Sequence, residues 1–464
     1  MLEQYFAAKE RLYPQSVKGR IRSLKWLLNF IFLSIYFLTP FLRFDRGAGV
    51  ADQAVLIDIV NRKLYFFFIE IWPQEVYYLA AILVVAAVGL FFVTSLFGRV
   101  WCGYACFQTV WTDIFIALER LFQGDRNQRI LLDRKKTFEK FWRKGLTHLS
   151  WILVALLTGY FFIGYFNDAF VLLDQLFKFE LSFNALMWIL GIAGMTYLMA
   201  GFAREHVCTF MCPYARFQSA MFDDNSLIIT YDEKRGEPRA KAPKDGNFEG
   251  RGDCIDCKQC VVVCPTGIDI RRGLQMECIA CGLCIDACNN VMDRVGLPRG
   301  LIRYDTLASI SDPGNPKKKF TLLRWRTFFY AAILTVFLGL ILRGLIYKSE
   351  FEFNASHNRN PIYVMMSDGS IRNSYSLNIV NKTNLVKKFK LKLDQPKAAA
   401  LKIQHQSGNV IKVGPGKIKS LDFYLTIAPD DLAKFVEDRA IVEIGVYDDQ
   451  GQKITELESI FIKK

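Results

Sequence analysis

No cysteine occurs after Cys288 in this 464-residue chain, although the chain contains twelve. The C-terminal part can therefore form no disulfide, which excludes a disulfide scaffold there. The sequence also lacks a G-x-G-x-x-G fingerprint after a strand and a G-x-x-x-x-G-K-[ST] phosphate loop. These absences exclude the common kinds of nucleotide chemistry.

Long apolar stretches are abundant by contrast. Hydrophobic residues make up 52% of the chain and aromatic residues 14%, which is rich for a soluble protein. Stretches of about 20 apolar residues can cross a bilayer, so we predict a multi-domain membrane protein with an α-helical transmembrane bundle of about five spans. The predicted spans are Leu24–Phe44, Tyr78–Phe97, Leu146–Phe166, Phe183–Ala203 and Trp325–Tyr347.

Lys and Arg are unevenly distributed among the connecting loops. The N-terminal flank carries six, the loop Gly98–Gly145 carries ten, and the loop Asn167–Ser182 carries only Lys178. Because positively charged loops stay in the cytoplasm, we expect the N-terminus inside and the C-terminus outside. The net charge of +14 could also serve nucleic-acid binding, but its alternation in step with the spans favours membrane insertion.

Eight of the twelve cysteines lie between Cys254 and Cys288, in two runs spaced C-x2-C-x2-C-x3-C. Each cysteine of the second run follows its counterpart by 24 positions. Structural zinc sites usually pair C-x2-C units across longer gaps, so the spacing favours iron–sulfur over zinc. The sequence predicts two 4Fe-4S clusters in an inserted two-cluster ferredoxin-like α+β domain, on the cytoplasmic side.

The ligand sets follow from the crossing rule of such ferredoxins, in which the fourth cysteine of each run binds the other cluster. One predicted set is Cys254, Cys257, Cys260 and Cys288. The other predicted set is Cys278, Cys281, Cys284 and Cys264.

The other four cysteines form two C-x3-C pairs, within W-C-G-Y-A-C at 101–106 and C-T-F-M-C-P at 208–213. The pairs are Cys102 with Cys106 and Cys208 with Cys212, each at the cytoplasmic end of an even-numbered span. Phe107 follows the first pair where Pro213 follows the second. Because positions i and i+4 share a helix face, we expect each pair to direct two thiols to one point and the pairs to meet.

Four converging thiolates would suit a further iron–sulfur centre, a copper(I) site or an electron-shuttling dithiol, with buried structural cysteines as the alternative. Met195, Met199 and Met211 lie near the second pair and could add thioether ligands, although packing is the simpler interpretation. His148 and His206 lie near cytoplasmic ends of spans and could be ligands or proton carriers.

Short stretches of alternating hydrophobicity follow the fifth span and predict an immunoglobulin-like β-sandwich without a recognisable site. The predicted strands are Pro361–Met366, Ser374–Val380, Lys387–Leu393, Leu401–Gln404, Leu421–Ile427, Ile441–Tyr447 and Glu456–Ile462. The predicted domains are a cytoplasmic segment 1–23, a four-span region 24–233, a ferredoxin domain 250–300, a fifth span 323–347 and an outer sandwich 350–464.

The double cysteine run, the two C-x3-C motifs, the five spans and the sandwich tail together resemble the cytochrome c oxidase accessory family CcoG, also called FixG or RdxA. The resemblance covers essentially the whole chain. It implies a multi-pass protein of the bacterial inner membrane that assists assembly of cbb3-type cytochrome c oxidase, with oxidase subunits or copper-delivery proteins as partners.

The family resemblance also implies reduction of Cu(II) to Cu(I). On this resemblance the eight cysteines of the double run would be cluster ligands, and Cys102, Cys106, Cys208 and Cys212 would be copper or redox thiols. Since no nucleotide motif is present, electrons would come from another protein or from quinol. Two alternatives stay open, a quinol-linked subunit of a periplasmic reductase system and a non-catalytic assembly scaffold.

Overall fold

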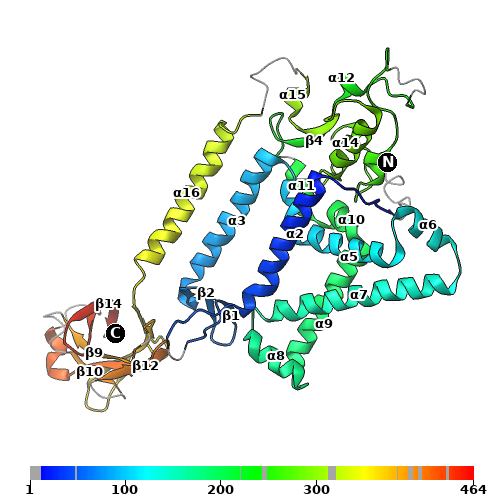
Figure 1. The fold of residues 1–464 in the computed structure, drawn as a ribbon. Coiled ribbons are helices and arrows are strands. Elements are labelled where there is room, and N and C mark those ends of the chain that lie inside the picture. Colours follow the sequence, from blue (N-terminus) through cyan, green and yellow to red (C-terminus); the bar gives the residue numbers. More distant parts are fainter. Residues whose placement is uncertain are drawn as a thin grey trace. The chain divides into compact units, whose positions relative to one another are not determined.

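The computed structural model describes residues 12–47, 50–219, 221–242, 248–311, 320–383, 385–394, 401–405, 410–434 and 438–463. The first eleven residues of the predicted N-terminal segment thus lie outside the described residues. The chain divides into two compact units, Met1–Phe44 with Gln53–Leu342 and Asp45–Asp52 with Arg343–Lys464 (Figure 1). Each unit is described by itself.

The first unit is mainly helical. Its helices up to the second cysteine pair are α2 (Arg20–Leu38), α3 (Val76–Phe97), α4 (Val100–Tyr104), α5 (Phe107–Gln123), α6 (Arg126–Arg134), α7 (Phe138–Ile163), α8 (Ala169–Phe177), α9 (Phe183–Leu198) and α10 (Arg204–His206). Two π-helical turns, η3 (Met199–Ala203) and η4 (Val207–Met211), flank α10, and α11 (Pro213–Ser219) follows.

The prediction of five apolar spans is confirmed. The helices long and apolar enough to cross a membrane are Arg20–Phe41, Val76–Phe97, Phe138–Ile163, Phe183–Met211 and Trp325–Ile346, the last being α16. Pro40 ends the first of them in a 3₁₀ turn, Thr39–Phe41, since proline cannot donate the next helical hydrogen bond. The fourth helix runs beyond the predicted end at Ala203, because the π-helical turns carry it on to Met211.

A small antiparallel sheet between α2 and α3 was not predicted. Its strands are β1 (Val55–Asp58), β2 (Lys63–Phe66) and β3 (Ile69–Ile71). Each strand has only three or four residues. Strands this short are not detected with the sequence windows of about 20 residues that identify membrane spans.

The ferredoxin-like part combines short helices with a two-stranded antiparallel sheet. It contains β4 (Ile228–Tyr231), α12 (Glu233–Gly236), α13 (Gln259–Val262), α14 (Leu283–Val295) and β5 (Ile302–Asp305). Both strands lie outside the predicted range 250–300, and they pair with Tyr231 opposite Ile302. Figure 1 shows this part beside the end at which α2 begins.

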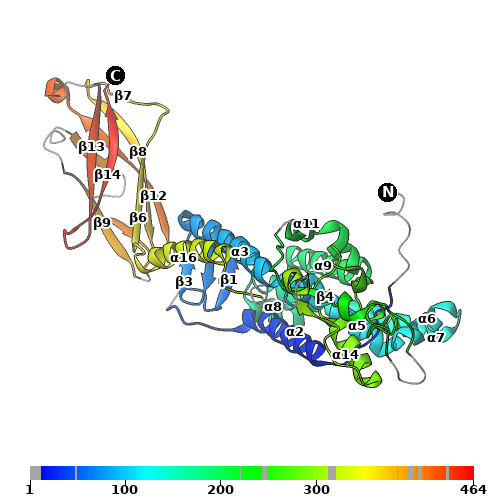
Figure 2. The same ribbon diagram turned by 90° about the horizontal axis from the view of Figure 1, so that it is seen from above.

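The second unit contains a sandwich of two antiparallel sheets, ordered β10-β12-β8-β6 and β11-β9-β13-β14, with β7 pairing with β8. Its strands are β6 (Phe351–His357), β7 (Val364–Met365), β8 (Ile371–Asn381), β9 (Lys387–Leu393), β10 (Leu401–His405), β11 (Ile411–Val413), β12 (Ile418–Ile427), β13 (Arg439–Tyr447) and β14 (Lys453–Ile462). Alternate side chains of β8 are buried, so the period-two pattern predicted the packing face correctly. The longer strands are seen along their length in Figure 2.

Candidate functional site

The eight cysteines of the double run surround two neighbouring cavities. We call Cys254, Cys257, Cys260 and Cys288 the outer centre, because all four line one cavity and Cys257 is exposed. We call Cys264, Cys278, Cys281 and Cys284 the inner centre, because all four line the other. The structure thus brings each predicted ligand set to one place, while Cys260 touches both cavities.

The backbone repeats with the same period as the cysteines. Asp256 and Lys258 have positive φ angles of 49° and 57°, and Ala280 and Gly282, 24 positions later, have 52° and 73°. Residues in this left-handed region turn the chain sharply, so successive cysteines of a run face a common point. The duplicated runs therefore share one loop geometry, although only Gly282 adopts it without a steric cost.

The chemistry of the donor sets fits iron–sulfur clusters. Burial, with neighbouring thiols acting in the same direction, raises the pKa of Cys278 and Cys288 to about 12. Burial thus disfavours the thiolate form of these cysteines in the absence of a bound cation, whereas cluster iron binds cysteine as thiolate. Such a group, when bound, would supply a one-electron carrier.

Each C-x3-C pair spans the end of one helix and the start of the next. Cys102 lies in α4, and Cys106 is extended (φ −62°, ψ 128°) just before α5. Cys208 lies in η4, and Cys212 is extended (φ −80°, ψ 112°) just before α11. The expectation that each pair shares one helix face is therefore wrong, because the second cysteine has left the helix. The two pairs are nevertheless alike in backbone, despite Phe107 in place of a proline.

The pairs do converge. Burial, then the charges of Cys106 and Cys212, raise the pKa of Cys102 to about 11. We call Cys102, Cys106, Cys208 and Cys212 the C-x3-C thiols. Within the described residues, no three or more His, Cys, Asp or Glu side chains are arranged to hold a single metal ion.

Two glutamines brace the repeats against one another. Gln218, after the second pair, accepts a hydrogen bond from Cys102 Sγ at 3.5 Å. Gln108, after the first pair, donates to the backbone oxygens of Met199, the first residue of η3, and Arg204, which follows η3, at 2.9 and 3.2 Å. A Phe-Gln dipeptide follows each pair in the sequence, at 107–108 and 217–218, but only the structure shows that each glutamine crosses to the other repeat.

The C-x3-C thiols lie against the inner centre. Cys102 and Cys208 pack on a buried cluster that contains Ile279 and Cys281. A Cβ at Gly103 would lie 2.8 Å from the Ile279 oxygen, so only glycine allows this close approach of α4 to the inner run. The C-x3-C thiols and the inner centre therefore lie next to each other.

Arg99 fastens this junction and was not identified from the sequence. Its buried guanidinium donates to the backbone oxygens of Met276 and Ala215, and to that of Cys278 at 3.1 Å. It lies in the loop whose positive charges were used to set the topology. The sequence does not distinguish a buried arginine from an exposed one in such a loop.

The two histidines line a separate polar cavity of about 390 Å³ together with Glu205, Trp151 and Phe202. His148 Nδ1 lies 3.0 Å from the Tyr197 hydroxyl, and His206 stacks on Phe210. Among the methionines, Met195 and Met211 are exposed. The structure therefore puts the histidines together but gives no common site for the methionine sulfurs.

Family models match three segments of the chain. Residues 203–307 match the 4Fe-4S dicluster domain, and residues 79–124 match a 4Fe-4S binding domain. Residues 341–464 match the IG-like fold at the C-terminal of FixG. The chain thus carries iron–sulfur domains, and the second match contains Cys102 and Cys106.

Curated relatives match over nearly the whole length. Nitrogen fixation protein FixG of Rhizobium meliloti is 41% identical over 94% of this chain and 90% of its own. Protein RdxA of Cereibacter sphaeroides is 42% identical over 92% of this chain and 91% of its own. A crystal structure of a FixG-related protein from Vibrio parahaemolyticus is 25% identical, covers 25% of this chain and 98% of that one, and aligns with a TM-score of 0.21.

Proposed function

The chain belongs to the FixG/RdxA family of membrane iron–sulfur proteins, and from this premise we propose that it is a cupric reductase that supplies Cu(I) for assembly of cbb3-type cytochrome c oxidase. The observation that carries this proposal is the packing of Cys102 and Cys208 against the inner centre. In this proposal the outer and inner centres each hold a 4Fe-4S cluster, which supplies one electron at a time when bound. Cu(II) needs one electron to become Cu(I), so the carrier and the substrate each exchange one electron per step.

The C-x3-C thiols would receive the copper substrate. Thiolate is a soft ligand that favours Cu(I) over Cu(II), so it stabilises the product of the reduction. In this proposal copper contacts one pair of these thiols while it is reduced. A further iron–sulfur centre on all four thiols is the competing use of the same residues.

The orientation is part of the proposal. We place the N-terminus and ferredoxin domain on the cytoplasmic side of the bacterial inner membrane, and the C-terminal sandwich on the periplasmic side, where it would meet oxidase subunits or copper-delivery proteins. The loop charges support this orientation. The corresponding domain ranges are 1–23, 24–233, 250–300, 323–347 and 350–464.

The test is anaerobic oxidation of the dithionite-reduced protein by Cu(II). The recovery of cluster absorbance measures the rate of this oxidation. We expect stoichiometric oxidation in the native protein and at least tenfold slower oxidation in Cys208→Ser/Cys212→Ser. Met211→Leu, a change of an exposed neighbour, is the matched control. Iron analysis must show that both variants keep their clusters, and unchanged oxidation in the double variant would remove the thiols from the reaction.

A second candidate is favoured by the cavity that His148 and His206 line. Its volume of about 390 Å³ lies in the usual range for a small-molecule site, and its aromatic and titratable walls suit a quinol headgroup. In this candidate the chain is a quinol-linked electron-transfer subunit. Cluster reduction by a quinol analogue in membranes, lost in His148→Phe, would support it.

A further inference from the structure

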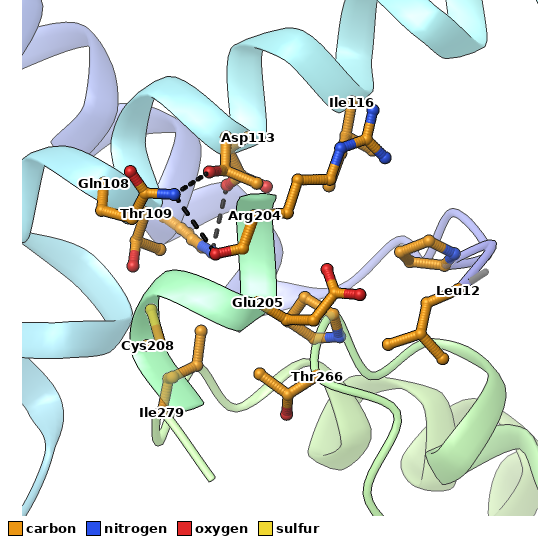
Figure 3. A pocket seen from close by; sticks show the side chains of 14 residues that line it. Leu12, Gln108, Thr109, Asp113, Ile116, Arg204, Glu205, Cys208, Thr266 and Ile279 are labelled. Atoms are coloured by element: carbon orange, nitrogen blue, oxygen red, sulfur yellow. Dashed lines mark hydrogen bonds and ion pairs between the residues drawn. The ribbon is translucent and has the colours of Figure 1, made fainter. Parts of the chain in front are cut away.

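Three charged side chains are buried together between α2 and α5. Lys25 Nζ lies 3.1 Å from Asp113 Oδ2, and Arg22 Nη1 lies 3.0 Å from the same oxygen. Lys25 is 1% exposed, Arg22 7% and Asp113 8%. Figure 3 shows Asp113 at the cavity that Cys208 and Ile279 also line, and Lys25 lines this cavity too.

This cluster carries an excess positive charge. Burial works against ionisation of Asp113, but Lys25 and Arg22 outweigh it and keep the pKa of this carboxyl below its usual range. Two cations and one anion leave one uncompensated positive charge away from water. Burying such a charge is costly unless something negative lies nearby, so the arrangement calls for a negative partner.

Part of that charge is balanced by Asp286, a buried carboxylate between Cys284 and Cys288, which accepts hydrogen bonds from the backbone nitrogens of Arg22 at 2.8 Å and Ile21 at 3.3 Å. Arg99, whose buried guanidinium donates to the Cys278 oxygen, adds a further cation, so the surroundings of the inner centre keep an excess positive charge. A Cβ on Gly282 would lie 2.8 Å from Ile21, so the first turn of α2 is seated on the inner run.

Lys25 follows Ile21 by one helical turn and therefore faces the same side. Lys25 shares its cavity with Thr266 and Ile279, and both of these residues also line the cavity of the inner centre. The excess charge is thus directed at the inner centre.

The outer centre has a different balance of charge. Arg271 is its buried cation, and it is paired with two carboxylates, Asp256 at 2.5 Å and Asp269 at 2.7 Å. The exposed Lys258, beside Cys257, offsets the second carboxylate, so no excess positive charge is buried at the outer centre. The two cysteine runs are alike in spacing and backbone but differ in the fixed charge buried beside them.

We propose that Lys25, held and partly balanced by Asp113, raises the reduction potential of the inner centre above that of the outer centre. A cluster gains one negative charge on reduction, so a fixed cation beside it stabilises the reduced form. An electron shared by the two centres would then reside mainly at the inner one, beside Cys102 and Cys208. This inference rests on the proposed function only in requiring both centres to hold clusters.

The test is a potentiometric titration of the purified, cluster-loaded protein followed by electron paramagnetic resonance. Lys25→Met removes the ammonium and leaves Asp113 paired with Arg22, so the potential of one cluster should fall. We expect about a tenfold change in the electron's distribution between the clusters, which is 59 mV for a one-electron couple. Asp113→Asn should raise the same potential, because both cations remain.

Two further variants separate charge from packing. Lys25→Arg keeps the charge and should leave both potentials unchanged. If Asp113→Asn does not accumulate, the comparison of Lys25→Arg with Lys25→Met still tests whether the charge of Lys25 sets the potential. Lys258→Met removes an exposed lysine beside Cys257 and should affect the inner potential least.

Equal shifts of both clusters, or no shift in Lys25→Met, would overturn the inference while leaving copper reduction intact. Absence of two cluster signals in the native protein would overturn the proposed function as well.

Discussion

The outer and inner centres are built from one repeated pattern, yet they lie in different surroundings. The outer centre reaches the surface at Cys257 and has the pair of carboxylates that holds Arg271 beside it. The inner centre is enclosed by α2 and α4 and has Lys25 and Arg99 beside it. A duplicated ligand loop thus sets the chemistry. Lys25 and Arg99, both more than 100 positions away in sequence, distinguish the inner copy, whereas residues near the first run distinguish the outer one.

The largest effect is expected from removing one ligand of each centre. Cys281→Ser should abolish the inner cluster and slow copper oxidation of the reduced protein by at least a hundredfold, because Cys281 is buried and water cannot replace the lost ligand. Cys257→Ser should cost less, since water or the serine oxygen can reach an exposed position. Iron content and paramagnetic resonance measure both. Equal losses in the two variants would show that exposure of the centres does not distinguish them.

Next in size is the attachment of the inner run to α2. Asp286→Ala removes both hydrogen bonds to the first turn of this helix, which we expect to destabilise the protein by about 1–2 kcal/mol. Thermal unfolding in detergent measures this loss. Asp293→Ala is the control on the same helix, because its pair with Arg299 is exposed and worth about 0–1 kcal/mol. A larger loss of stability in Asp293→Ala than in Asp286→Ala would mean that the hydrogen bonds of Asp286 to α2 do not stabilise the protein more than the exposed ion pair does.

Thiol reactivity should give a smaller, pH-dependent difference. The pKa of Cys102 is raised to about 11, so its thiolate is the minor form at neutral pH and becomes more abundant as pH rises. Alkylation of Cys102 should therefore accelerate about tenfold per pH unit between pH 7 and 10. Mass spectrometry of the alkylated peptide provides the rate. A rate independent of pH would indicate a thiolate already held by a metal.

The smallest effect is expected at the outer centre. Asp269→Asn removes one of the two carboxylates on Arg271, so the potential of the outer cluster should rise towards that of the inner cluster. The shift should be less than the change in Lys25→Met, because Asp269 is partly exposed and solvent screens its charge. The same potentiometric titration resolves it, and a larger shift than in Lys25→Met would reverse our ranking of the two surroundings.

The sequence predicted what depends on local spacing. The cysteine runs, the apolar spans and the alternating strands each follow a short repeat that can be recognised without the fold. The conformation of Cys106 and Cys212 was not predicted, because i and i+4 spacing does not reveal where a helix ends. Arg22 and Lys25 are two of the six Lys and Arg in the N-terminal flank, which the sequence analysis used only to set the topology, and their ion pairs with Asp113 give them another role.

The cap that Asp286 forms on α2 also constrains the order in which the protein is made. The backbone nitrogen of Arg22 and its partner carboxylate are 264 positions apart. At a synthesis rate of about 5–20 residues per second, the first helix waits roughly ten to fifty seconds for its partner. Four spans are synthesised before Asp286, which caps the first turn of α2. Cluster insertion and the final packing of α2 are therefore late, coupled steps of biogenesis.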